Sequence, residues 1–162
     1  MAVKGYSRAQ IVLHWAVVLL VIQQFVLHDG IVASFRTKVE TGVSTFTLLT
    51  VLHIAGGMAI LAFALWRLEM RRSRGVPPPP AEDSAVQKLV AKLVHGGIYL
   101  VLILLPLSGT VAWAVPSPTA GGVHGVLRIV LFALVALHIA GAIYGQFVQK
   151  TGIIGRMMKA AD

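Results

Sequence analysis

Four long apolar segments constrain the fold of this chain more than any other feature. They cover approximately residues 9–28, 46–67, 89–113 and 123–148. A helix of about 20 apolar residues crosses the hydrocarbon core of a bilayer, and it satisfies its own backbone hydrogen bonds in lipid. Only 12% of the residues are charged, about half of what a soluble domain carries. The sequence therefore predicts an all-α, integral membrane four-helix bundle, with residues 1–162 forming a single domain.

The lysines and arginines lie mostly on one side of the predicted bundle. Three of them, Arg36, Lys38 and Arg128, fall on the side of the first and third connections. The other eleven fall on the side of the two termini: Lys4, Arg8, Arg67, Arg71, Arg72, Arg74, Lys88, Lys92, Lys150, Arg156 and Lys159. Because membrane proteins keep basic residues on the cytoplasmic side, we expect both termini in the cytoplasm. This asymmetry accounts for the net charge of +8, and we expect no nucleic-acid partner.

The connections between the segments are short. We expect residues 29–45 and 114–122 to be loops on the outer side, and the four prolines at 77–80 to form a stiff spacer on the cytoplasmic side. The first apolar segment follows basic residues, as in a signal peptide, but it is long and carries His14 and Gln23. We therefore expect it to be retained as a membrane helix.

Histidines are the side chains in these segments that can bind a metal. The chain has no cysteine, which excludes iron–sulfur ligation and covalent haem attachment. Six histidines are present: His14, His28, His53, His95, His124 and His138. Ionisable side chains inside a membrane are costly and usually functional. We expect His28, beside Asp29, to be an interfacial side chain instead.

Two histidines on the fourth segment define two levels in the membrane. His124 and His138 are 14 residues apart, which is about 21 Å of rise and about 40° from a whole number of turns. His53 is expected at the outer level with His124, and either His14 or His95 at the cytoplasmic level with His138. Two histidine pairs on different helices suit two six-coordinate haems, whereas zinc needs four ligands at one point. The alternative is that these histidines only bond neighbouring helices.

Short motifs follow one another along the chain in a set order: Tyr6-Ser7-Arg8-x-Gln10, His14-Trp15, His53, His95-x-x-Ile98-Tyr99, Leu105-Pro106-x-x-Gly109 and the His124/His138 spacing. With these motifs the sequence resembles the bacterial cytochrome b561 family, and the resemblance covers essentially the whole chain. The sequence is also similar to the related cytochrome b subunits of nickel–iron hydrogenases and formate dehydrogenase.

This resemblance implies a cofactor arrangement and an activity. It pairs His14 with His138 on a cytoplasmic haem b and His53 with His124 on an outer haem b. His95 then lies near a quinone site, or it supports a haem ligand or propionate. The implied activity is transmembrane electron transfer in the bacterial inner membrane. For the nearest bacterial relatives this means a superoxide:quinone oxidoreductase that passes electrons from superoxide to ubiquinone.

Three arginines are predicted to bind haem propionates, since guanidinium pairs well with carboxylate. Arg8 and Arg67 belong to the cytoplasmic level, where an orientation signal explains them equally well. Arg128 lies on the outer side within the fourth segment, where the positive-inside rule does not expect a basic residue. This position favours a role at the outer haem.

Two other functions fit the same sequence. One is a haem b anchor subunit that passes electrons between quinone and a dehydrogenase or small cytochrome. The other, of a different class, is a haem-free transporter or structural bundle that uses its histidines for proton movement or packing. Haem content separates the second alternative from the first.

Overall fold

The computed structural model describes residues 5–161, and that part of the chain is helical without β-strands. The five α-helices are α1 (Arg8–Val26), α2 (His28–Thr41), α3 (Leu48–Ser73), α4 (Ala85–Ala114) and α5 (Pro118–Ile143). A π-helical turn η1 (Tyr144–Val148) extends α5, and a short 3-10 helix η2 (Ile154–Met157) follows. Four helices are long and apolar enough to cross a membrane: α1, α3, α4, and α5 together with η1. The predicted all-α membrane fold is confirmed.

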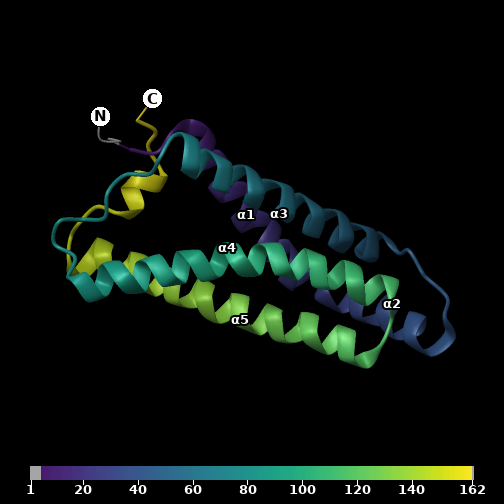
Figure 1. Ribbon diagram of the computed structural model, residues 1–162. Coiled ribbons are helices and arrows are strands. Elements are labelled where there is room, and N and C mark those ends of the chain that lie inside the picture. The colour runs from purple at the N-terminus through teal and green to yellow at the C-terminus, as the bar shows by residue number, and fades with distance from the viewer. Residues whose placement is uncertain (1–4, 162) are drawn as a thin grey trace.

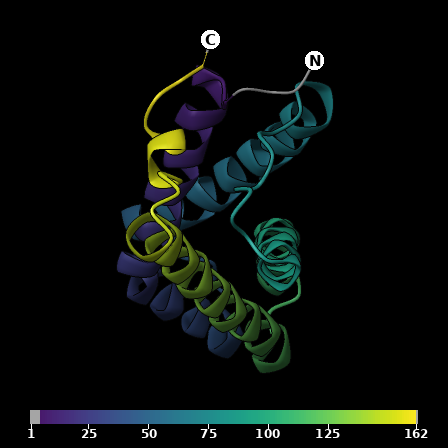
Figure 2. The ribbon, with the colours of Figure 1, turned by 90° about the vertical axis from the view of Figure 1, so that its left-hand side faces the viewer.

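The four long helices run side by side in two packed pairs. α1 packs along α3 and α4 along α5, and contacts between α3 and α4 join the pairs (Figure 1). The start of α1 and the C-terminal segment lie at the same end of the bundle, where the Ala161 amide donates to the Tyr6 carbonyl at 3.0 Å (Figures 1 and 2). We call this the terminus end; it also holds the α3–α4 connection. The opposite end, called the α2 end, holds α2 and the α4–α5 turn (Figure 1).

The helix starts follow from local capping. The Ser7 hydroxyl accepts from the Gln10 amide at 3.3 Å, while the Gln10 side chain accepts from the Ser7 amide at 2.9 Å. This capping box satisfies amides that a helix start leaves open. It gives a structural reason for the Tyr6-Ser7-Arg8-x-Gln10 motif. Ser84 and Gln87 make the same box at the start of α4.

The bundle interior is small, and the outer faces are apolar. The core consists of Val17, Ile60, Ala64, Val101, Leu102 and Leu131. Only 6% to 22% of each span is buried within the protein. Large apolar side chains such as Leu19 and Phe132 are about two-thirds exposed, at 66% and 64%. We therefore expect lipid to cover these faces, because exposing so much apolar surface to water would be unfavourable.

The outer loop predicted at residues 29–45 is wrong, since its first part forms α2. This helix carries several charges, so an analysis based on long apolar runs does not detect it. Gly42 ends it with a left-handed φ of 74°, and its amide donates to Lys38. The buried Ser34 and Thr50 hydroxyls are 2.6 Å apart, and the Lys38 ammonium lies 4.6 Å from the Trp113 ring centre. These contacts fix α2 on the bundle.

Predicted helix boundaries also differ from the structure, and α4 begins at Ala85 instead of near residue 89. The last span begins at Pro118 instead of near residue 123, because Ser117 caps it and proline suits a first helical position. The predicted loop at 114–122 therefore shrinks to a tight turn. α3 continues to Ser73, beyond the predicted end at residue 67. Of the basic residues predicted for the cytoplasmic side, Lys4 lies outside the described residues.

Candidate metal-binding histidine pairs

Five histidines from four helices meet at two levels of the bundle. At the α2 end, His53 of α3 and His124 of α5 have ring centres 6.3 Å apart. Towards the terminus end, His14 of α1 and His138 of α5 also have ring centres 6.3 Å apart. His95 of α4 joins this second level, with its ring centre 5.0 Å from that of His138.

The spacing of the two 6.3 Å pairs fits a metal bound between the rings. Two metal–nitrogen bonds of about 2.0 Å, with about 1.1 Å from each nitrogen to its ring centre, separate two opposed imidazole centres by about 6.2 Å. The 5.0 Å between His95 and His138 is too short for that arrangement. Among residues 5–161, no group of three or more histidine, aspartate or glutamate side chains lies close enough to hold an ion. The donor set therefore fits a metal that brings its equatorial ligands with it, as haem does.

The ring of His124 is held by the backbone of α4. Its Nδ1 lies 3.1 Å from the Leu105 carbonyl oxygen and 3.1 Å from the Ser108 hydroxyl. A carbonyl only accepts, so Nδ1 must carry the hydrogen. The Ser108 hydroxyl itself donates to Leu105 at 2.9 Å. This leaves the Nε2 lone pair of His124 free for a metal, which is the usual second-sphere support of a ligating histidine.

Gly109 makes room for the same ring. A β-carbon at this position would meet His124 Cε1 at 3.1 Å and Nδ1 at 3.3 Å. Pro106 lies within α4 in the same stretch. The Leu105-Pro106-x-x-Gly109 motif therefore positions His124 through one carbonyl and one missing side chain. Ser108 was not among the predicted site residues. A hydroxyl side chain within an otherwise apolar segment is the sequence feature that could have indicated it.

His53 has an unpartnered nitrogen. Its Nδ1 is buried without a hydrogen-bond partner, and such atoms are rare because they are costly. A metal would give this nitrogen a partner only if it bound at Nδ1 itself; a metal at Nε2 would leave it unpaired. Nearby on α1, the Gln23 amide donates to the Leu52 carbonyl at 3.0 Å, and Gly56 packs against the Gln23 and Gln24 side chains.

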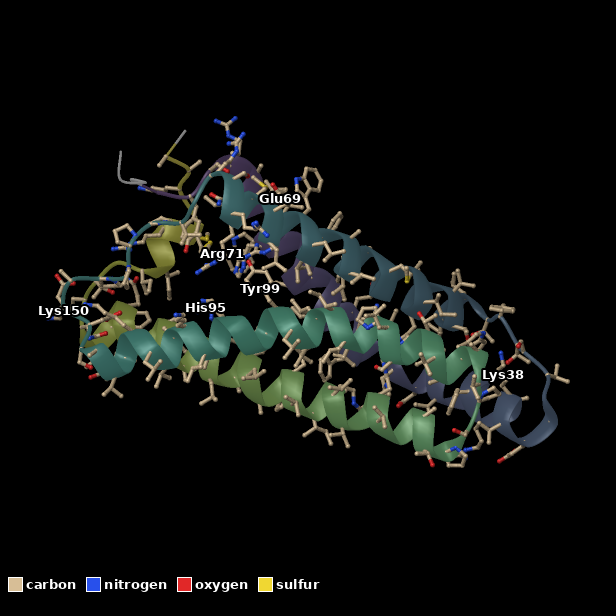
Figure 3. All side chains as sticks on the ribbon, viewed as in Figure 1. Lys38, Glu69, Arg71, His95, Tyr99 and Lys150 are labelled. Carbon is tan, nitrogen blue, oxygen red and sulfur yellow. The ribbon has the colours of Figure 1, made fainter. Side chains whose placement is uncertain are left out.

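The terminus-end level has a basic and aromatic surround. His95 Nδ1 lies 2.6 Å from the Ala91 carbonyl oxygen, which leaves its Nε2 free. Arg67 lies with its guanidinium 6.0 Å from the Tyr99 ring centre, and its Nη1 donates to the Gln10 carbonyl at 3.2 Å. Figure 3 shows His95 and Tyr99 on the side of α4 that faces Arg71 of α3. This level thus combines imidazole, phenol and guanidinium groups.

The remaining predicted residues lie further out. Arg8 is exposed on the outer side of α1, so the structure favours Arg67 over Arg8 as a group facing the His14 level. Arg128 is half-buried on α5. Burial lowers the pKa of His28, the nearby Arg128 charge lowers this pKa further, and Asp29 opposes both effects. His28 and Arg128 therefore lie close together at the α2 end.

Comparison with known proteins identifies the family. The sequence pattern of the prokaryotic cytochrome b561 family matches residues 5–160. The chain belongs to this family. Cytochrome b562 of Cereibacter sphaeroides is 31% identical over 159 residues, covering 96% of each chain. Cytochrome b561 homolog 1 of Escherichia coli is 25% identical, covering 94% of this chain and 96% of that protein. The probable superoxide oxidase CybB of Yersinia pestis is 26% identical, covering 96% of each.

Family membership explains the histidine pairs in general terms. A prokaryotic cytochrome b561 binds haem b and takes part in electron transport. With four membrane-spanning helices, this cytochrome b561 is a multi-pass protein of the bacterial inner membrane. The family predicted from the sequence motifs is confirmed.

Proposed function

We propose that this cytochrome b561 holds two haem b groups and acts as a superoxide:quinone oxidoreductase. One observation supports it above all: two histidine pairs have the same 6.3 Å ring spacing. Their members on α5, His124 and His138, are separated by about 21 Å of helix rise. A cofactor on each pair would place one redox centre in each half of the membrane.

The charges suggest how the protein is oriented. Ten of the thirteen lysines and arginines among residues 5–161 lie towards the terminus end, which by the positive-inside rule would face the cytoplasm. The α2 end then faces the periplasm. His53 and His124 are the proposed ligands on the periplasmic side, and His14 and His138 on the cytoplasmic side.

The chain's own residues would hold and tune the cofactors. Bound haem b supplies an iron that alternates between ferric and ferrous states, one electron at a time. Ser108 and the Leu105 carbonyl would orient His124. Arg67 is the proposed partner of a propionate at the cytoplasmic level, with Arg8 as a more exposed second, and Arg128 the partner at the periplasmic level.

Superoxide is the proposed electron donor at the α2 end. The described residues at this end include three basic residues, Arg36, Lys38 and Arg128, and two acidic ones, Asp29 and Glu40. The remaining positive charge would raise the encounter rate of a small anion. A relative of similar length carries the name probable superoxide oxidase. Each superoxide would lose one electron and become dioxygen. Two superoxide anions therefore match one quinone, which takes up two electrons.

Quinone is the proposed acceptor at the terminus end. Reduction to quinol also requires two protons from the cytoplasmic side. His95 is the proposed proton relay: its Nδ1 donates to the Ala91 carbonyl, so the free Nε2 would take up a proton from the cytoplasmic side and pass it to the reduced quinone oxygen. Tyr99, one turn further along α4, lies on the same face.

A stopped-flow experiment tests this function. Purified protein in liposomes containing ubiquinone would be mixed with enzymatically generated superoxide, while haem reduction and quinol formation are followed. We expect both signals, and their loss when superoxide dismutase is added. If dithionite reduces the haem but superoxide does not, superoxide is not the electron donor. Such a result would favour a protein partner as donor, as in an anchor subunit.

A further inference from the structure

Two buried nitrogen atoms without a hydrogen-bond partner lie where α1 packs against α3. They are Nε2 of Gln24 on α1 and Nδ1 of His53 on α3, and among the described residues they are the two buried side-chain polar atoms that lack such a partner. An unpaired buried polar atom is costly, so each one needs an explanation. Here an amide and an imidazole are both unpaired in the same region of the bundle.

Gly56 brings the two helices into close contact beside His53. A β-carbon at this glycine would collide with Nε2 of Gln24 and would lie 2.8 Å from Oε1 of Gln23. At the next residue, Gly57, a β-carbon would meet nothing within 4 Å. Residues three apart on a helix are neighbours on its surface, so Gly56 lies one turn from His53. The Gln24 carboxamide therefore lies against the part of α3 that carries the ring.

The neighbouring Gln23 holds α1 in this position. Its Nε2 donates to the Leu52 carbonyl at 3.0 Å, which joins α1 to the residue directly before His53. Gln23 therefore has a partner, whereas the amide of Gln24 has none. A carboxamide carries a donor nitrogen and an acceptor oxygen on the same carbon. Rotation of the Gln24 side chain can thus present either group to α3 without moving α1.

The ring of His53 needs an acceptor if it binds a metal through Nε2. At His124, Nδ1 donates to the Leu105 carbonyl, and this bond leaves Nε2 for the metal. A metal-binding histidine usually donates its other ring N–H to a carbonyl or carboxylate in this way. At His53 no backbone carbonyl takes that role. Gln24 is the unpaired polar side chain on the helix that packs along α3.

We propose that Gln24 is a positioning residue for His53. Its Oε1 would accept the Nδ1 hydrogen, which fixes the orientation of the ring and makes Nε2 a stronger electron donor to iron. Nε2 of Gln24 would then donate to Oε1 of Gln23, which lies beside the same glycine. The inference rests on the proposed haem at the α2 end. It gives His53 a support from an α1 side chain, where His124 uses the backbone of α4.

The midpoint potential of the haem at the α2 end tests this proposal in haem-loaded, detergent-purified protein. The variants are made in the His138→Gln background, in which this haem is expected to be the one that remains. Gln24→Leu removes the acceptor at similar volume, so His53 should donate less electron density to the iron. The ratio of ferrous to ferric haem at a fixed potential should then rise about tenfold, which corresponds to about 59 mV. Gln24→Glu keeps an acceptor oxygen, so its potential should stay at or below that of the background.

Thr50→Val is the matched control for a loss of polarity near the haem. Thr50 is fully buried one turn before His53, and its hydroxyl lies 2.6 Å from that of Ser34 and 2.9 Å from that of Thr47. Its removal should leave the potential unchanged, because this hydroxyl is bonded within its own group.

Three results would overturn the role of Gln24 while two haems in the wild type leave the proposed function standing. They are an unchanged potential in Gln24→Leu, an equal rise in Thr50→Val, and a Gln24→Glu potential as high as that of Gln24→Leu. A wild-type protein without haem at the α2 end would overturn this inference and the proposed function together.

Discussion

The His124 imidazole lies directly against the backbone of Gly109. A β-carbon at Gly109 would come within 3.1 Å of His124 Cε1, tighter than ordinary van der Waals contact. The ring cannot move away freely, because its Nδ1 lies between the Leu105 carbonyl and the Ser108 hydroxyl. The position of this proposed ligand is therefore set by α4 as much as by its own helix.

Gly109→Ala tests that dependence. The added methyl group should push the ring out of its hydrogen bonds and reduce haem retention at the α2 end by about tenfold. Haem per chain would be measured after purification and dialysis against a haem-binding protein. Gly122→Ala is the control, because a β-carbon there meets nothing within 4 Å. Full retention in Gly109→Ala would contradict the proposed role of this contact.

Ser108→Ala removes one of the two groups at His124 Nδ1 while leaving the helix intact. Haem affinity at this level should fall by about tenfold, and the midpoint potential of one haem should shift. Redox titration followed by absorbance would measure the shift. Thr110→Ala provides the comparison, since the Thr110 hydroxyl donates to the Pro106 carbonyl in the same helix. Identical titrations for both variants would show that Ser108 does not act through His124.

Replacing His14 and His95 separately distinguishes a ligand from a neighbour. The His14–His138 spacing of 6.3 Å accommodates a metal, whereas the His95–His138 spacing of 5.0 Å does not. We expect His14→Gln to lose one haem per chain. His95→Gln should keep both haems and slow quinone reduction. If His95→Gln instead loses a haem while His14→Gln keeps both, the cytoplasmic pair has been assigned wrongly.

His28 should make the protein sensitive to acid. Burial and the Arg128 charge lower its pKa below the ordinary value of 6.5. As the pH falls through 6.5, the unfolded chain therefore takes up a proton before the folded chain does, and the folded state loses stability. Above that pH the effect is absent. Thermal unfolding, followed by haem absorbance, would be measured at pH 7.5 and at pH 5.5. Between these two values the melting temperature of His28→Gln should fall less than that of the wild type. Parallel curves would refute this role.

Much of the fold was predictable because the bilayer imposes one simple rule. Continuous apolar runs that are long enough to span the bilayer are expected to be helices. All four such runs in this chain are helical in the structure. The depth of each histidine follows from its place along its helix. The pairing of His14 with His138 came only from family resemblance. The structure brings these rings together, and their role as ligands stays a prediction.

Other features depend on contacts that no periodic pattern reveals. α2 is held by the Ser34–Thr50 hydroxyl pair and by Lys38 over Trp113, which join residues distant in sequence. The role of Ser108 depends on the rotation of α4 relative to α5. A motif such as Leu105-Pro106-x-x-Gly109 marks an unusual backbone, but it does not say which ring lies against it.

Haem content and redox absorption of the purified protein test the central claim most directly. The account predicts two haem b groups per chain, with reduced spectra typical of low-spin iron bound by two histidines. It also predicts that His124→Gln and His138→Gln each leave one haem, and that the double variant leaves none. A single haem in the wild type would contradict the two-pair arrangement. No haem, after expression with added haem, would contradict the electron-transfer function altogether.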